Sequence, residues 1–140
     1  MTASATTFAG RTALALIFVL SGAGKLAAYA GTQQYMESVG VPGALLPLVI
    51  LAELGGGLAL VAGLLTRTTA TALALFSVVA AGLFHADFAD QNQMIHFLKN
   101  IAMAGGLLVL AAHGAGRFSL DALLARRTTR NAATPAGAAR

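Results

Sequence analysis

The sequence predicts an all-α integral membrane protein: a four-helix bundle with its N and C termini in the cytoplasm. Two properties of the 140 residues lead to this prediction. First, 57% of the residues are hydrophobic and only 10% are charged, whereas a soluble domain carries about 25% charged residues. Second, the apolar residues gather in four stretches. Each stretch is close to the roughly 20 residues that a helix needs to cross a bilayer.

The four expected spans follow one another with short breaks. Alanine, glycine and leucine dominate the spans, which suits close packing of helices in lipid. The longest break is the polar segment Ala30–Gly43, which is expected to be a loop, whereas Thr66–Thr69 and Asp87–Asn92 are expected to be tight turns. The spans themselves are predicted at residues 8–29, 46–65, 70–88 and 93–112.

The chain changes character after the fourth span. Residues 1–118 are expected to form the membrane bundle, and residues 119–140 to leave it. Ser119 is placed to cap a short amphipathic helix with an apolar side of leucines, and a disordered basic tail is expected to follow. The leucines are Leu120, Leu123 and Leu124, and the basic residues are Arg126, Arg127 and Arg130.

The basic residues outside the spans set the expected orientation, because short basic loops stay in the cytoplasm. The arginines, including Arg11 and Arg67, fall on the side of the two termini, whereas Glu37, Asp87 and Asp90 fall on the other side. The apolar run that follows Arg11 also resembles a cleavable signal peptide. The lysine at position 25 and the three later spans favour an uncleaved first helix instead.

The composition argues against several classes of chemistry. The chain has no cysteine, which excludes disulfides, thiol redox chemistry and cysteine-bound iron–sulfur clusters. Its net charge of +4 comes mainly from residues beside the apolar segments, which indicates membrane topology rather than nucleic-acid binding. No ligand-spacing motif indicates a metal site.

Five ionisable side chains, with an asparagine beside them, stand out within the expected spans, where ionisable residues are costly and rare. Counted along each helix, all six fall in the outer half of the bilayer, so a four-helix bundle can bring them together. Two lysines against one glutamate leave one positive charge, which suits an anion or a reducible carbonyl compound. We therefore expect a substrate or ligand pocket, and the alternative is a structural ion pair that locks helices together. The six residues are Lys25, Glu53, His85, His96, Lys99 and Asn100.

Glu53 is central to this hypothesis, and its carboxylate is expected to face Lys25 or Lys99. Small residues near these side chains and in the fourth span predict that neighbouring helices approach closely there. These helix-packing residues are Ser21, Gly22, Gly56, Gly57, Gly105 and Gly106.

Short motifs along the chain, taken together, resemble the DoxX family of small four-helix membrane proteins. The resemblance runs from about residue 11 to residue 121, and it rests on the order and spacing of the motifs. The motifs are Phe18-x-x-Ser21-Gly22-x-x-Lys25-Leu26, Gly40-x-Pro42, Glu53-x-x-Gly56-Gly57, Gly63-x-x-Thr66-Arg67, Lys99-Asn100 with Gly105-Gly106, and Gly114-x-Gly116-x-x-Ser119-x-Asp121.

This resemblance implies a multi-pass protein of the bacterial cytoplasmic (inner) membrane, surrounded by lipid. It also implies the membrane subunit of a redox system, because relatives include a subunit of thiosulfate:quinone oxidoreductase. The implied substrate is quinone-like or a small sulfur-containing anion, quinone is the implied cofactor, and a separate redox subunit is the implied partner. Two alternatives stay open: a small proton-coupled transporter that uses Glu53, and a non-catalytic scaffold for a partner enzyme. The sequence also leaves open whether the bundle forms a homo-oligomer.

Overall fold

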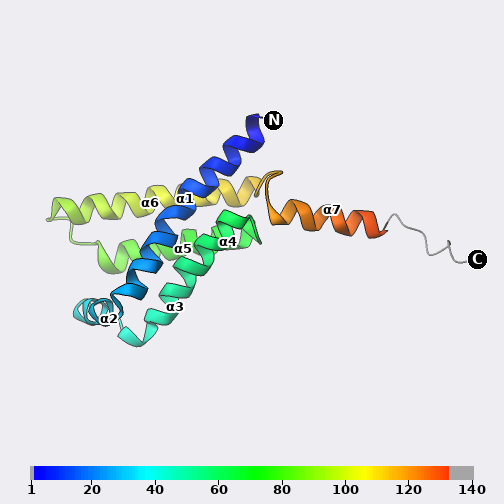
Figure 1. Ribbon diagram of the computed structural model, residues 1–140. Coiled ribbons are helices and arrows are strands. Elements are labelled where there is room, and N and C mark those ends of the chain that lie inside the picture. The colour runs from blue at the N-terminus through cyan, green and yellow to red at the C-terminus, as the bar shows by residue number, and fades with distance from the viewer. Residues whose placement is uncertain (1, 133–140) are drawn as a thin grey trace, which may run out of the picture.

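The computed structural model describes residues 2–132, and every regular element in that part of the chain is helical (Figure 1). The spanning segments are α1, the run from η1 to α4, α5 and α6, with α2 and α7 outside them. The elements are α1 (Thr2–Ala27), α2 (Tyr29–Ser38), the 3-10 turn η1 (Gly43–Leu45), α3 (Leu46–Ile50), the π-helical turn η2 (Leu51–Gly55), α4 (Gly56–Ala62), α5 (Thr66–Phe84), α6 (Gln91–His113) and α7 (Leu120–Ala132).

Four helical segments of the described chain are long and apolar enough to cross a membrane, which confirms the predicted number of spans. They cover Ala3–Ala27, Gly43–Ala62, Thr66–Phe84 and Gln91–His113. Large apolar side chains point outward from them: Leu20, Leu51 and Leu75 are 62%, 68% and 66% exposed. A soluble protein rarely leaves so much contiguous apolar surface in water, so this surface is the one that faces lipid.

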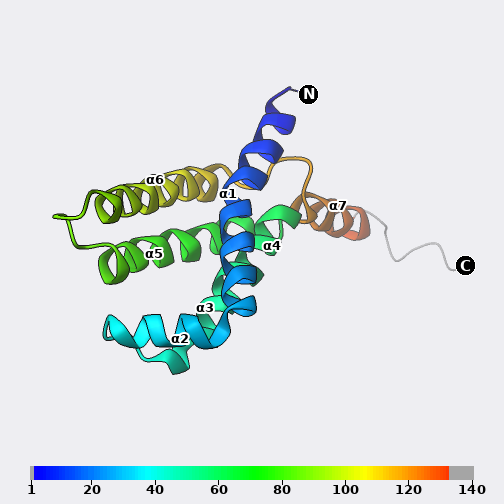
Figure 2. The ribbon, with the colours of Figure 1, turned by 60° about the vertical axis from the view of Figure 1, so that its left-hand side comes forward.

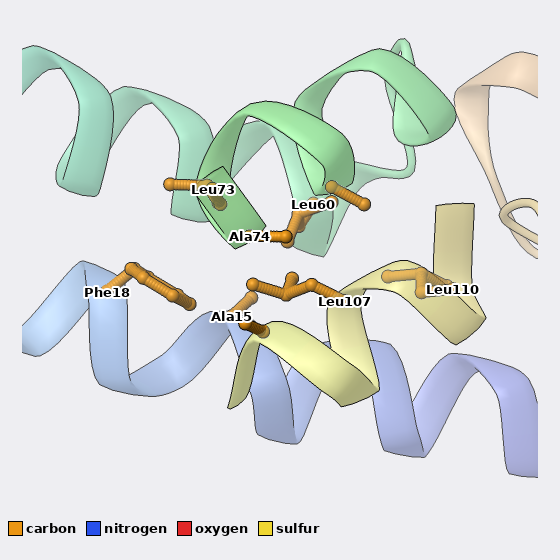
Figure 3. Packing of buried hydrophobic residues seen from close by; sticks show 9 residues of the cluster. Ala15, Phe18, Leu60, Leu73, Ala74, Leu107 and Leu110 are labelled. Atoms are coloured by element: carbon orange, nitrogen blue, oxygen red, sulfur yellow. The ribbon is translucent and has the colours of Figure 1, made fainter. Parts of the chain in front are cut away.

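The bundle is built from two helical pairs. Helices α5 and α6 lie side by side as an antiparallel hairpin, while α1 packs along the rod formed by α3, η2 and α4 (Figures 1 and 2). Their shared core is small, and alanines in it allow the helices to approach closely (Figure 3). It consists of Ala15, Phe18, Leu60, Ala70, Leu73, Ala74, Ala104, Leu107 and Leu110.

Two breaks between spans differ from the sequence-based expectation. The expected loop Ala30–Gly43 contains α2, because two residues of this polar segment find partners in the bundle: Met36 is 2% exposed, and the ring of Tyr35 stacks on Phe84 at 5.9 Å. The expected tight turn Thr66–Thr69 is instead the first turn of α5. The chain reverses just before it, at Gly63 and Leu65, whose φ angles are +66° and +47°.

The end of the bundle where α1 begins and α6 ends, here called the terminal end, is closed by Arg11. This arginine is 1% exposed, and its guanidinium donates hydrogen bonds to the carbonyl oxygens of Ala115 (2.6 Å), Phe118 (2.9 Å) and Val61 (3.2 Å). From the sequence, Arg11 was used only to predict which end of the bundle faces the cytoplasm. The structure shows that its side chain is also buried and joins three segments of the chain. Arg11 holds the first half of α1 against the end of α4 and the segment that leaves α6.

The segment after α6 is fixed to the same end of the bundle. Ser119 caps α7, as its position predicted, by accepting a hydrogen bond from Ala122 N at 3.2 Å. Asp121 accepts hydrogen bonds from Leu65 N at 2.8 Å and Thr66 N at 2.9 Å, and so caps the start of α5. Helix α7 then points away from the bundle and continues to residue 132, further than expected (Figure 2). The rest of the expected disordered tail, residues 133–140, lies outside the described residues.

Candidate functional site

A cavity of about 490 Å³ lies at the opposite end of the bundle from the terminal end. Its walls come from α1, α2, the segment from η1 to η2, α5 and α6. Most of the lining is apolar, with Phe18, Phe76, Val79 and Leu83 among the larger side chains. Concave, mostly apolar sites with a few polar groups are typical of small-molecule binding.

The six polar residues singled out in the spans all line this one cavity. They come from four places in the fold that are distant in sequence: α1, η2, the end of α5, and two successive turns of α6. The residues are Lys25, Glu53, His85, His96, Lys99 and Asn100.

Glu53 and Lys25 form an ion pair on one wall of the cavity. The Lys25 Nζ lies 2.7 Å from Oε2 and 2.9 Å from Oε1 of Glu53. Ser21 completes the group, because its hydroxyl donates to Glu53 Oε1 at 3.2 Å and accepts from Lys25 Nζ at 2.6 Å. Of the two partners considered for Glu53, the structure pairs it with Lys25.

The backbone around Glu53 explains how its carboxylate reaches the cavity. Glu53 is 6% exposed and lies in η2, a single π-helical turn between α3 and α4. A π turn holds one more residue than an α turn, so it shifts the helix face that follows it, and such turns occur often at functional sites. On the neighbouring helix, Gly22 lies against Leu54, which lets α1 approach this turn closely.

The second polar group of the cavity consists of His85 and His96. Their rings stack with centroids 5.1 Å apart and planes inclined by 26°. His85 Nδ1 is hydrogen-bonded to Gln93 Oε1 at 2.8 Å, which orients the ring from the start of α6. One turn further along α6, Asn100 Nδ2 donates to His96 O at 3.0 Å. Among the described residues, no group of three or more potential metal ligands converges.

Lys99 is the cationic side chain of the cavity that has no carboxylate partner. Among the residues that the structure describes, the Lys25–Glu53 contact is the one ion pair. The nearby acidic residues Asp87 and Asp90 bond backbone amides instead: Asp87 accepts from Ala89 N, and Asp90 accepts from the first amides of α6. The cavity lining therefore carries one uncompensated positive charge when its histidines are neutral.

Most of the expected helix-packing residues lie at close contacts between helices. A Cβ added at Gly57 would lie 2.8 Å from Val19 Cγ2, and one at Gly56 or Gly106 would lie 3.2 Å from a leucine of a neighbouring helix. Gly105 differs, since a Cβ there would meet nothing within 4 Å. Ser21 acts through hydrogen bonds to the ion pair.

The sequence reasoning missed the cavity wall that α2 contributes. Thr32, Tyr35 and Met36 line the cavity, although the segment was expected to be a loop. The one signal available was an aromatic residue and a methionine side by side in an otherwise polar stretch. The π-helical turn gave no recognisable signal, because its residues continue the apolar pattern of the helix.

Comparison with known proteins identifies the family. Residues 6–86 match the family model of DoxX. The chain belongs to the DoxX family. Over 84% of its length it is 50% identical to the inner membrane protein YqjF of Escherichia coli (strain K12), and the match covers 90% of that protein. Over 79% of its length it is 35% identical to the inner membrane protein YphA of the same organism, with 84% of that protein covered. No solved structure matches the chain.

The location of the two relatives is consistent with the apolar, outward-facing surface of this DoxX-family protein. Both are inner membrane proteins, and the chain has four helices able to span a bilayer. It is therefore a multi-pass protein of the inner membrane. The family model covers the chain from residue 6, within α1, to just beyond the end of α5, and thus includes Lys25, Glu53 and His85 of the cavity.

Proposed function

We propose that this DoxX-family protein is the membrane subunit of a redox system, and that its cavity binds a quinone-like or small sulfur-containing anionic substrate. The observation that carries the proposal is a largely apolar cavity of about 490 Å³ with hydrogen-bond donors from Lys99 and Asn100 on one side. A quinone offers a flat apolar ring and carbonyl oxygens that accept hydrogen bonds, and these features match such a wall.

Two groups of residues would contact different parts of the ligand. Phe18, Phe76 and Leu83 offer apolar contact for a ring. Lys99, Asn100 and the histidines offer polar contact for oxygen atoms at its edge. A bound quinone would supply the electron-accepting chemistry. The chain has no cysteine and offers no redox group of its own, so electrons would come from a partner subunit.

The direct test is binding of 2-methyl-1,4-naphthoquinone and of thiosulfate to the purified protein in lipid nanodiscs. We expect saturable binding of at least one of them. Ala80→Leu, which places a larger side chain in the cavity wall, should weaken it at least tenfold, since one methylene in a hydrophobic binding pocket changes the binding free energy by about 1–3 kcal/mol. Val78→Leu is the matched control, because Val78 lies on the same helix and is 47% exposed. Absence of binding, or equal binding by both variants, contradicts the proposal.

A second candidate, proton-coupled transport, is favoured by the buried carboxylate of Glu53 facing the cavity from a π-helical turn. Against it stands the packed core below the cavity, with Ala15, Leu60 and Leu107 each 0% exposed. Uptake of thiosulfate into proteoliposomes, driven by a proton gradient and lost in Glu53→Gln, would favour the transporter. Co-purification of a soluble enzyme with no ligand binding would favour the scaffold.

A further inference from the structure

We propose that the cavity selects ligands that carry one negative charge, and that Lys99 is the residue that holds the anionic group. This inference rests on the proposed function and specifies the class of its substrate: an amphipathic anion with an apolar body. The site would therefore prefer an anionic quinone over a neutral quinone of the same size.

Lys25, the other lysine of the cavity, is already engaged within the protein. Its ammonium group contacts both oxygens of Glu53, at 2.7 and 2.9 Å, and the hydroxyl of Ser21 at 2.6 Å. Its charge is thus balanced within the wall, and its three donor hydrogens already have acceptors. Lys25 is therefore poorly placed to take a further anion.

Among the described residues, no carboxylate forms an ion pair with Lys99. The chain has five acidic residues in all. Besides Glu53, Asp121 lies at the terminal end, where it caps α5. Asp87 accepts a hydrogen bond from a backbone amide of the turn before α6, and Asp90 accepts from amides in the first turn of α6. The carboxylate of Glu37 lies next to Gly43, at the start of the second span, and Glu37 is absent from the cavity lining. The charge of Lys99 is consequently open to a ligand.

Lys99 is accompanied in the cavity lining by further polar groups and by apolar side chains. His96 lies one turn earlier on α6 and Asn100 is the next residue, and both line the cavity with it. Imidazole and amide nitrogens can donate to an anionic oxygen, as the ammonium group does. The rest of the ligand would contact the apolar wall formed by Phe76 and Val79. This juxtaposition of an unpaired cation, further donors and an apolar wall is what an amphipathic anion requires.

The test compares two probes of similar size in nanodiscs of phosphatidylcholine at neutral pH. 2-Methyl-1,4-naphthoquinone is neutral, and 2-hydroxy-1,4-naphthoquinone is an anion. We expect the anion to bind roughly tenfold more tightly, as befits one hydrogen bond to a charged group. Lys99→Met should abolish this preference, because the anion loses more affinity than the neutral probe does. Thermal unfolding of the variant verifies that it is folded. Lys99→Arg, which keeps the charge, should preserve the preference.

The outcomes separate this inference from the proposed function. Equal binding of the two probes by the unmodified protein overturns the charge selectivity and leaves quinone binding in place. Binding of neither probe overturns the quinone-binding function and this inference with it. A preference for the anion that survives in Lys99→Met overturns the assignment to Lys99.

The anionic group could belong to a free molecule or to a lipid headgroup, since both offer oxygen anions. Repeating the measurement with phosphatidylglycerol added to the nanodiscs distinguishes them. If this lipid displaces the anionic probe from the unmodified protein but has no effect in Lys99→Met, then Lys99 holds a lipid phosphate. If the probe binds unchanged, the cavity takes the free anion. Either result supports an anion site at Lys99 and identifies its source.

Discussion

Glu53 is almost fully buried within a membrane helix, where a carboxylate without partners is costly. The structure offsets this cost with three hydrogen bonds from two side chains of α1, Lys25 and Ser21. These residues are one helical turn apart, so they reach the carboxylate from the same face of α1. The three side chains act as one unit in which removal of a single member leaves the others unsatisfied.

The first prediction follows from this unit. Lys25→Met should lower the stability of the protein in detergent by about 1–3 kcal/mol, because it leaves a buried charged acceptor without its donor. Adding Glu53→Gln should restore part of the loss, since the stranded charge is then gone. Thermal unfolding of the two single variants and the double variant measures this coupling. Lys99→Met serves as the control and should have little effect on stability, whereas an equal loss in Lys99→Met would contradict the pairing.

At the scale of elements, the site depends on how closely α1 approaches the rod of α3, η2 and α4. A Cβ added at Gly22 would lie 2.8 Å from the backbone nitrogen of Leu54, the residue after Glu53. Gly57 makes a similar approach from the other helix, toward Val19. These two glycines allow the backbones to come near enough for Lys25 and Glu53 to meet.

The second prediction compares two glycines that look alike in sequence. Gly22→Ala should destabilise the protein by about 1–3 kcal/mol, as overpacking of a well-packed contact typically does, because its new methyl group meets backbone atoms. Gly105→Ala should be neutral or slightly stabilising, because alanine favours helix over glycine and the space there is open. Thermal unfolding in detergent compares both variants with the unmodified protein. Equal effects of the two substitutions would show that the helices are not packed as described.

A second pair of elements is joined at the terminal end, where Asp121 links α7 to the start of α5. Burial raises the pKa of Asp121, but hydrogen bonds from Thr66 and Leu65 and the charge of Arg11 lower it by more. The pKa therefore lies below its ordinary value of 3.8. Because the pKa is depressed in the folded state, the stabilisation is complete above that ordinary value and is lost as the pH falls through the lower pKa of the folded protein.

The third prediction makes this link measurable. Asp121→Asn should reduce stability at neutral pH by about 1 kcal/mol, since it weakens a helix cap. The difference between variant and unmodified protein should stay constant from pH 7 to about pH 5 and shrink below about pH 4, where the carboxylate of the unfolded protein begins to be protonated while that of the folded protein is still ionised. Thermal unfolding across this pH range is the measurement. A difference that grows on acidification would show that Asp121 is not held as an ion.

At the scale of the whole molecule, the apolar pattern of the sequence predicted the four spans because lipid contact requires apolar residues on every turn of a helix. Interactions that involve few residues produce no such repeated pattern. Helix α2 is fixed by Tyr35 and Met36 within a polar segment, and the π turn at Glu53 interrupts no pattern. The positive-inside rule uses the charge of Arg11 in the same way whether the side chain is exposed or buried, so the burial of Arg11 could not be predicted from it. The convergence of polar residues was predictable from their depth along the helices, whereas the choice of Lys25 over Lys99 depended on the crossing of α1 and η2.

The last prediction concerns the orientation of the molecule in the membrane. We expect the terminal end to face the cytoplasm, because arginines gather there while Asp87 and Asp90 lie at the other end. The chain has no cysteine, so single cysteines can report accessibility without background. Ala89→Cys, in the turn between α5 and α6, should react with a membrane-impermeant maleimide in intact spheroplasts. Arg117→Cys, just after α6, should react only after lysis. Labelling of Arg117→Cys in intact spheroplasts would reverse the orientation, and would also place the cavity and Lys99 on the cytoplasmic half of the bilayer.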